Sequence, residues 1–321
     1  MASSTNTCTR YPTSWNPKKT CRCHNSAGQL GHAFRRLNFR QNLGQARFDE
    51  LPTSPSKTIL IPALKSLIIV ILLGFAGLGQ AGERIAIAAA ADLRFALDEI
   101  VRQFLAANPD DTIEVSYGSS GKFFTQIQQG APYDLFFSAD IAYPRALEKA
   151  GYAGSPVIPY AIGRLVLWST GRDASKMTLD DLADPRIGKV AIANPQHAPY
   201  GKRAEEALKA RGLWQAVSAK AVYGENISQT AQFVQTGNAD IGIIALSLAL
   251  NPALAEKGNY ALIPANLHQP LEQGFLILKP AIDKPLARRF AAQMSKATTQ
   301  AVLKRHGFQV PSEATDNERR P

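Results

Sequence analysis

The sequence of 321 residues predicts an α/β protein of two lobes, each a mostly parallel sheet flanked by helices, with two crossover strands joining them. Short apolar segments alternate with amphipathic helical segments over residues 83–151, which is typical of a parallel sheet with helices on its faces. The alternation stops at an apolar segment with no helix after it, resumes over residues 190–245, and ends in a strand that rejoins the first region. We therefore assign residues 82–161 with 272–313 to lobe I and residues 162–271 to lobe II.

The first region contains three predicted strands and three predicted helices. The strands are short and apolar, as expected of buried parallel strands. Asp92 belongs to a residue type that favours N-caps and is predicted to cap the first helix, while Gly130 and Gly151 are predicted to end the next two. In chain order the predicted elements are strand 85–91, helix 93–105, strand 113–117, helix 122–129, strand 133–138 and helix 143–149.

The second region shows the same alternation after a different start. A strand over residues 162–168 comes first, and Thr178 is predicted to cap a short helix before the β/α units begin. Strands and helices are then predicted at 190–193, 202–209, 222–223, 229–235 and 239–245. The chain returns through a strand at 271–278, an amphipathic helix is predicted at 285–296, and residues 298–305 with Gly307 and Phe308 complete the predicted fold.

The positive charge of the chain is concentrated in its first quarter. Residues 1–81 contain ten of the 36 lysines and arginines but only two of the 26 acidic residues, a charge of +8, so residues 82–321 carry only +2 of the total of +10. We therefore expect no nucleic-acid partner for the body of the protein. All three cysteines, Cys8, Cys21 and Cys23, also lie in the leader, which leaves the body without a disulfide, a thiolate metal site or a Cys nucleophile.

Residues 57–81 are predicted to be a secretory signal peptide. Lys65 precedes an apolar run at 67–76, and small residues stand at the −3 and −1 positions of the predicted cleavage site. An uncleaved membrane anchor is the less favoured alternative, because a span needs about 20 apolar residues. Residues 1–56 are expected to be a disordered basic extension, either a transit peptide or the product of a misassigned start, and residues 314–321 a disordered tail.

Four predicted helices start with small or polar residues directly after a strand or turn. A helix N-terminus presents free amide N–H groups and the positive end of the helix dipole, which suits an anion. Ser119 and Ser120 add two hydroxyls at one such start, although the alternative is that they only cap their own helix. Because two starts fall in each lobe, we expect all four to converge on one cleft. The starts lie at 91–92, 119–121, 199–201 and 226–228.

Basic residues follow three of these starts, at Arg94, Lys122 and Lys202 with Arg203. Cations are unfavourable for the dipole at a helix N-terminus, so they point either to a field tuned for an anion or to ordinary solvated charge.

No catalytic constellation is recognisable in the body. His197, His268 and His306 are widely spaced, and the chain has no HExxH, GxSxG or Walker motif. No His can be placed beside the Ser-Gly turn at 118–121 from the sequence, so this turn is not predicted to be a nucleophile elbow. We expect a protein that is not an enzyme and needs no cofactor, with a hydrolase built on Ser120 as an alternative.

Residues 83–311 resemble the periplasmic molybdate-binding proteins of ABC importers, which are two-lobed (type II) solute-binding proteins. The motifs that carry this resemblance follow the order of the family and span the body of the chain. They are AAAADL at 88–93, SYGSSG at 116–121, GAPYDLFFSAD at 130–140, YAIGRLVLWS at 160–169, NPQHAPYG at 194–201 and HGF at 306–308. The resemblance implies a type II periplasmic-binding-protein fold and a molybdate or tungstate ligand held in the cleft between the lobes.

The resemblance also implies which residues bind the ligand. In this family a tetrahedral dianion is held through hydrogen bonds from neutral donors, with no direct ligation of the metal. By motif, Ser120 contributes its hydroxyl and amide from lobe I, and Tyr200 and Ile227 contribute backbone amides from lobe II. Ala91 and Asp92 occupy the first-loop position, where the family usually has a hydroxyl residue.

Asp92 is the residue that bears most on ligand identity. An ionised carboxylate beside an anion is repulsive, by roughly 4 kcal/mol for two unit charges about 4 Å apart at an effective dielectric near 20. One interpretation is that Asp92 caps its own helix and offers only its N–H to the cleft. The other is that it accepts the proton of a protonated oxyanion such as hydrogen phosphate. We favour capping.

The sequence thus predicts a monomeric periplasmic protein that captures molybdate or tungstate and delivers it to the membrane permease of an ABC importer. Specificity against sulfate is expected to come from pocket size, because both ligands are dianions and the amide donors are alike. Two alternatives of function stay open: a binding protein for phosphate or sulfate, and a periplasmic sensor that binds the same anion but reports to another partner.

Overall fold

The computed structural model describes residues 82–310. The predicted disordered extension (1–56), signal peptide (57–81) and tail (314–321) lie outside the described residues. Within residues 82–310, no helix is both long enough and apolar enough to cross a membrane.

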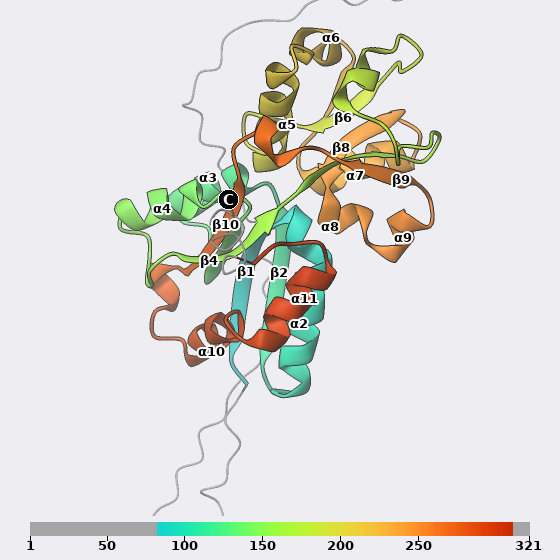
Figure 1. Cartoon of the computed structure of the whole chain (residues 1–321). Coiled ribbons are helices and arrows are strands. Elements are labelled where there is room, and N and C mark those ends of the chain that lie inside the picture. The colour runs from blue at the N-terminus through green and yellow to red at the C-terminus, as the bar shows by residue number, and fades with distance from the viewer. Residues whose placement is uncertain (1–81, 311–321) are drawn as a thin grey trace, which may run out of the picture. The chain divides into compact units, whose positions relative to one another are not determined.

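The first sheet has five strands in the order β2-β1-β3-β10-β4 (Figure 1). β1 is parallel to β2 and β3, whereas β10 is antiparallel to both of its neighbours, so four strands share one direction and β10 alone is reversed. The strands are β1 Arg84–Ala90, β2 Thr112–Gly118, β3 Leu135–Ser138, β4 Ile158–Gly163 and β10 Leu271–Ile277.

The second sheet repeats this design in the order β7-β6-β8-β5-β9. β6 is parallel to β7 and β8, and β5 is antiparallel to β8 and β9, so here β5 alone is reversed. The strands are β5 Leu165–Ser169, β6 Val190–Ala193, β7 Ala221–Gly224, β8 Ile241–Ala245 and β9 Asn259–Leu262. Two separate sheets of mainly co-directional strands, each with its own helices, confirm the predicted fold class.

The chain passes between the sheets twice, and each passage leads into a reversed strand. It leaves the first sheet after β4 for β5 and returns from β9 to β10. The single strand predicted over residues 162–168 is wrong in this respect. It is two strands in different sheets, because Ile162 pairs with Glu272 while Leu165 pairs with Ala245, and Arg164 lies at the break.

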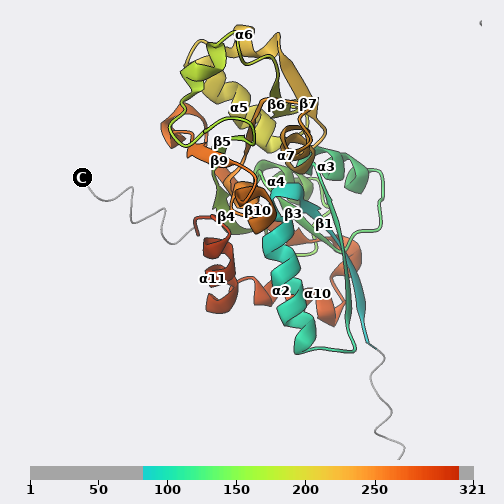
Figure 2. The ribbon, with the colours of Figure 1, turned by 90° about the vertical axis from the view of Figure 1, so that its right-hand side faces the viewer.

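Helices flank both sheets. In the first region α2 and α11 pack side by side (Figures 1 and 2), and in the second α5 and α7 pack against β6 and β8. The helices of the first region are η2 Ala91–Leu93, α2 Arg94–Ala106, α3 Ser120–Gln128, α4 Ala142–Lys149, η5 Lys279–Ala281, α10 Pro285–Gln293 and α11 Ala297–Arg305. Those of the second are η3 Leu179–Ala183, α5 Pro199–Ala210, α6 Trp214–Ser218, α7 Ile227–Gln235, α8 Leu246–Ala249, α9 Pro252–Ala255 and η4 Ala265–Leu267.

Aromatic stacking fixes the centre of the first sheet. The rings of Phe137 on β3 and Phe275 on β10 are stacked with centroids 4.7 Å apart, and Phe290 of α10 packs edge-on against Phe137. All three side chains are fully buried. Burying such rings provides much of the hydrophobic stabilisation of a domain.

Most element ends agree with the sequence signals. Gly130 and Gly151 follow α3 and α4 in left-handed conformations with φ of +87° and +80°, which glycine adopts without strain. Thr178 forms the capping box of η3 with Asp181. Apart from the three-residue 3₁₀ helices η4 and η5, the elements that were missed are α6, α8, α9 and β9. Each has only four or five residues, too few for a period to be recognised.

Candidate functional site

A small pocket lies where four loops from the two sheets meet. Its lining comes from segments 90–92, 118–120, 198–200 and 226–227 together with Ala139, all within the described part of the chain. The five residues expected to bind the ligand all line it: Ala91, Asp92, Ser120, Tyr200 and Ile227. None of the lining residues is Lys, Arg or His.

Ser120 lies at the start of α3, and its side chain is buried. Its Oγ accepts a hydrogen bond from the Ala139 amide at 3.0 Å, so the hydroxyl proton stays free to be donated. Its own amide, at the first position of the helix, has no intrahelical acceptor. The interpretation that these serines only cap their own helix is wrong, because neither the Ser119 nor the Ser120 side chain makes a capping bond.

A histidine does lie beside this turn, contrary to the sequence-based expectation. His197 Nδ1 is 3.1 Å from Ser119 Oγ, because α3 and the loop before α5 are brought together. The pair is not a nucleophile and its base, however: the Ser119 hydroxyl donates to the carbonyl oxygen of His197 itself, so the ring nitrogen must donate to Ser119. Burial, with Lys122 nearby, lowers the pKa of His197, which favours the neutral ring.

The second sheet contributes two helix N-termini. α5 begins at Pro199, which suits a first helical position, and Tyr200 follows it. At the start of α7, the Asn226 side chain accepts from the amides of Ser228 and Gln229, both at 3.0 Å, but not from Ile227. The amides of Tyr200 and Ile227 stand in first turns, where no intrahelical acceptor is in reach, and so remain available to an anion.

The prediction that Asp92 caps its helix is wrong. Neither η2 nor α2 has a side-chain cap. Instead the Asp92 carboxyl, 1 % exposed, turns into the protein, and its Oδ2 accepts hydrogen bonds from the Tyr200 hydroxyl at 2.9 Å and Gln273 Nε2 at 2.6 Å. Its Oδ1 is buried with no partner within the described residues. Burial raises the pKa of Asp92 to about 6, although the hydrogen bonds from Gln273 and Tyr200, and to a smaller extent the nearby backbone amides of Asp92 and Leu93, oppose this rise.

Two residues that the sequence analysis missed hold this carboxyl in place. Gln273 on β10 is fully buried, and its Oε1 accepts from the Tyr160 hydroxyl of β4 at 2.6 Å. This bond orients the carboxamide so that its NH₂ faces Asp92. A partial signal was present: Gln273 stands with Glu272 in a strand whose other side chains are apolar, and a buried amide needs partners. Tyr200 was expected to contribute only its backbone, yet its hydroxyl is part of the same network.

Hydrogen bonds join the two regions around the pocket. Ser228 Oγ of α7 donates to the Ala91 carbonyl at 3.1 Å, and Ser247 Oγ of α8 donates to the Asp92 carbonyl at 2.8 Å. On the other side the Gly121 amide donates to the His197 carbonyl at 3.0 Å. The loops from both sheets are therefore fixed against one another at the rim of the pocket.

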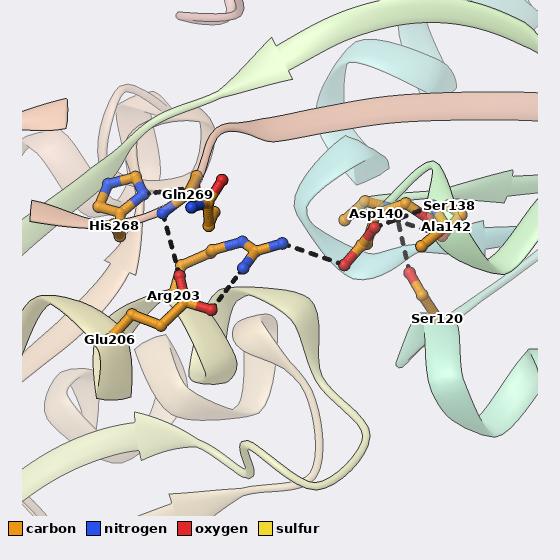
Figure 3. Close-up of polar contacts among 9 residues, drawn as sticks. Ser120, Ser138, Asp140, Ala142, Arg203, Glu206, His268 and Gln269 are labelled. Carbon is orange, nitrogen blue, oxygen red and sulfur yellow. Dashed lines mark hydrogen bonds and ion pairs between the residues drawn. The ribbon is translucent and has the colours of Figure 1, made fainter. Parts of the chain in front are cut away.

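A buried ion bridge supports the same arrangement farther along α5 (Figure 3). Arg203 Nη2 lies 3.3 Å from Asp140 Oδ2, in the loop after β3, and Nη1 lies 2.5 Å from Glu206 Oε1. The Arg203 and Asp140 side chains are only 10 % and 14 % exposed. Ala139, whose amide donates to Ser120, precedes Asp140 directly, so the bridge connects the α3 start to the helix that carries Tyr200.

The cations that follow the helix starts do not face the pocket. Lys122 pairs with Glu225 at 2.8 Å, and Arg94 lies over the ring of Tyr117 at 5.5 Å. None of the four cations, Arg94, Lys122, Lys202 and Arg203, is among the residues that line the pocket. Residues 82–310 also contain no group of three or more His, Cys, Asp or Glu arranged to hold a metal ion.

Two sheets linked by two crossings, with helix N-termini from both around one pocket, define a two-lobed solute-binding protein. Sequence comparison agrees: bacterial extracellular solute-binding proteins match residues 85–309. The chain belongs to this family. It is 33 % identical over 252 residues to the molybdate-binding protein ModA of Azotobacter vinelandii, covering 77 % of this chain and 98 % of the relative. It is 34 % identical to ModA of Rhodobacter capsulatus over 243 residues, covering 74 % and 92 %.

A solved structure gives the same result in three dimensions. The periplasmic molybdate-binding protein of Azotobacter vinelandii superposes with a TM-score of 0.66 at 32 % identity, covering 71 % of this chain and 99 % of that one. The predicted family resemblance is confirmed.

Proposed function

We propose that this chain is a periplasmic binding protein that captures molybdate in the pocket between its lobes and delivers it to the permease of an ABC importer. The observation that carries the proposal is the pocket lining: hydroxyl and first-turn amide donors from both sheets, with no basic side chain among them. The molybdate-binding relatives, matched over nearly their whole length, support the choice of ligand. Export through a cleaved signal peptide at 57–81 belongs to the same proposal.

Three of the five residues expected to bind the ligand act as neutral hydrogen-bond donors in this proposal. Ser120 donates through its hydroxyl and amide, and Tyr200 and Ile227 donate through their amides. Each helix N-terminus adds a partial positive charge of about half an elementary charge. Ala91 and Asp92 close the pocket from the start of η2. Neutral donors hold a dianion without the full countercharge that would oppose its release to the permease.

A single copy of the chain supplies the whole pocket, which supports action as a monomer. Tungstate has the same shape and charge as molybdate, so we expect it to bind as well.

A calorimetric titration of residues 82–321 with molybdate, tungstate, sulfate and phosphate tests the proposal. We expect molybdate and tungstate to bind more tightly than the smaller sulfate and phosphate. A preference for phosphate or sulfate would overturn the molybdate assignment, and no binding of any oxyanion would overturn the proposed function. A pull-down of membrane permease components with the ligand-loaded protein would separate an importer subunit from an anion sensor.

A further inference from the structure

Asp92 is the one lining residue of the pocket with an acidic side chain, and only half of its carboxyl group is hydrogen-bonded. Oδ2 accepts two hydrogen bonds, whereas Oδ1 is buried without a partner in the described part of the chain. Leaving an ionised oxygen buried and unpaired is costly. When Oδ1 carries a proton, its O–H group can donate a hydrogen bond to an anion in the pocket.

The surrounding network determines which oxygen carries the proton. Tyr160 donates to Gln273 Oε1, which turns the Gln273 NH₂ toward Asp92 Oδ2. The Tyr200 hydroxyl also donates to Oδ2. Burial raises the pKa of both tyrosines well above the usual value, so both remain protonated donors. With two hydrogens already directed at Oδ2, a proton on the carboxyl group must be on Oδ1.

No cation among the described residues compensates an ionised Asp92. The elements packed against η2 are α2, α7 and α8, and neither α7 nor α8 contains an ionisable residue. On α2, Arg94 is held over the Tyr117 ring, and the carboxylates of Asp98 and Glu99 bind Tyr117 and Arg305. From α5 and β4 the carboxyl meets only Tyr200 and, through Gln273, Tyr160. An ionised Asp92 would place three negative charges together once a dianion entered the pocket.

We propose that Asp92 is a specificity-determining residue that binds the dianion in its protonated form, with Oδ1 as hydrogen-bond donor, so that capture at neutral pH takes up one proton. This inference rests on the proposed oxyanion function. Its geometric basis is the buried, unpartnered Oδ1 beside an Oδ2 already supplied with two donors. Burial also raises the pKa of the free carboxyl to about 6, which makes the protonated form accessible near neutrality.

The chemical class of ligand follows from this donor. A site with donors alone fits an oxyanion that has no proton of its own, such as molybdate, tungstate or sulfate. Hydrogen phosphate carries an O–H group that needs an acceptor, and a protonated Asp92 does not supply one at Oδ1. A site that binds through fixed polar groups rejects a ligand that leaves one of them unpaired. In its protonated form Asp92 thus selects against hydrogen phosphate, while pocket size is expected to select against sulfate.

The test is titration calorimetry of molybdate into residues 82–321 between about pH 6 and pH 8, in two buffers of different ionisation enthalpy. We expect uptake of close to one proton per molybdate at the upper end, and affinity that falls about tenfold per pH unit above the free pKa. Asp92→Asn places a permanent amide donor at the position of Oδ1, because Tyr200 and Gln273 require the oxygen at Oδ2. This variant should bind without proton uptake, independently of pH, and about 100-fold more tightly than the unmodified chain near pH 8.

Asp98→Asn is the matched control, since it removes the same charge from an exposed position on α2 outside the pocket. It should leave proton uptake and the pH dependence unchanged. Molybdate binding with no proton uptake, combined with weaker binding by Asp92→Asn at every pH, would overturn the role of Asp92 and leave the proposed function intact. A preference for phosphate that Asp92→Asn abolishes would show an ionised, accepting Asp92 and overturn both. No binding of molybdate at any pH would overturn the proposed function itself.

Discussion

Two buried contacts between the sheets involve the first turns of α5. They differ in whether the buried ionisable group has a partner of opposite charge. Arg203 is a buried cation with two carboxylate partners, Asp140 and Glu206. Asp92, which Tyr200 contacts one turn earlier on α5, is a buried acid with hydroxyl and amide partners but no cation. In the bridge, which holds the structure together, the buried charge has partners of opposite charge. In the pocket, which must accept and release an anion, the buried acid has no cation beside it.

This difference explains why the pocket contains no basic residue although α5 and α3 carry several. A Lys or Arg in the lining would hold a dianion strongly and would pair with Asp92 in its absence. The cations near the pocket are instead occupied by Glu225, Asp140 and Glu206 at its periphery. The comparison predicts that the bridge acts mainly on stability and the pocket mainly on binding.

Breaking the bridge should have the largest effect on stability. Arg203→Met leaves Asp140 and Glu206 without their cation in a largely buried position, and we expect a loss of about 3–5 kcal/mol in the free energy of unfolding. Urea denaturation monitored by circular dichroism measures it. Arg288→Met, which removes an exposed arginine paired with exposed Asp283, is the control and should change little. Equal effects of the two substitutions would show that the bridge does not stabilise the contact.

The free energy of unfolding should depend on pH because Asp92 is a buried acid with no cation beside it. The folded protein holds the Asp92 proton with a pKa of about 6, against an ordinary value of 3.8, so it binds this proton more tightly than the unfolded chain does. The contribution of Asp92 to stability is therefore fully present at low pH and is lost as pH rises from about 4 to about 6, a change of about 3 kcal/mol.

Asp92→Asn provides the reference for this measurement, because it lacks the titrating group and keeps an oxygen for Tyr200 and Gln273. The difference in unfolding free energy between the unmodified chain and this variant should shift in favour of the variant across that pH range, without ligand. A constant difference from about pH 4 to pH 7 would contradict a raised pKa at Asp92.

Removing a pocket donor should weaken molybdate binding. Ser120→Ala deletes a hydroxyl that is free to donate to a charged ligand, and we expect a loss of about 1.5–3 kcal/mol in molybdate binding, measured by calorimetry. Ser175→Ala, at an exposed position in the second region, is the control. Unchanged affinity in Ser120→Ala would remove this hydroxyl from the site.

Obstructing the contact between the start of α3 and the loop before α5 should have a smaller effect on molybdate binding. A Cβ at Gly121 would lie 2.6 Å from the His197 carbonyl oxygen and 2.9 Å from the Tyr143 hydroxyl, so Gly121→Ala forces the α3 start away from the loop before α5. We expect molybdate binding to weaken by about 1–3 kcal/mol. Gly171→Ala, where a Cβ meets no atom within 4 Å, should bind normally. Normal binding by both variants would mean that this contact is not needed for capture.

The fold was predictable because its signals are local and repeated. Apolar strands of regular length and glycine helix ends such as Gly130 and Gly151 are recognisable without tertiary information. The break at Arg164 was not, because only the pairing partners of Ile162 and Leu165 assign the two halves of that segment to different sheets. The lobe boundaries chosen from the sequence stay a prediction.

The backbone positions of the pocket were also predictable, but the side-chain chemistry was not. Helix starts at 91–92, 119–121, 199–201 and 226–228 follow from sequence, and the structure brings all of them to one pocket. The orientation of Asp92 depends on Gln273, which is 181 residues away, and that of Ser119 depends on His197, 78 residues away. Such contacts override a local preference for N-capping, which was the only guide to Asp92 in the sequence.

The most direct test of the account is diffraction from crystals grown with molybdate, recorded at the molybdenum absorption edge. We expect one strong anomalous peak in the pocket, with the ligand oxygens in hydrogen-bonding contact with the Ser120 hydroxyl, the amides of Tyr200 and Ile227, and Asp92 Oδ1. A peak elsewhere on the protein, or none in crystals soaked at saturating molybdate, would contradict it.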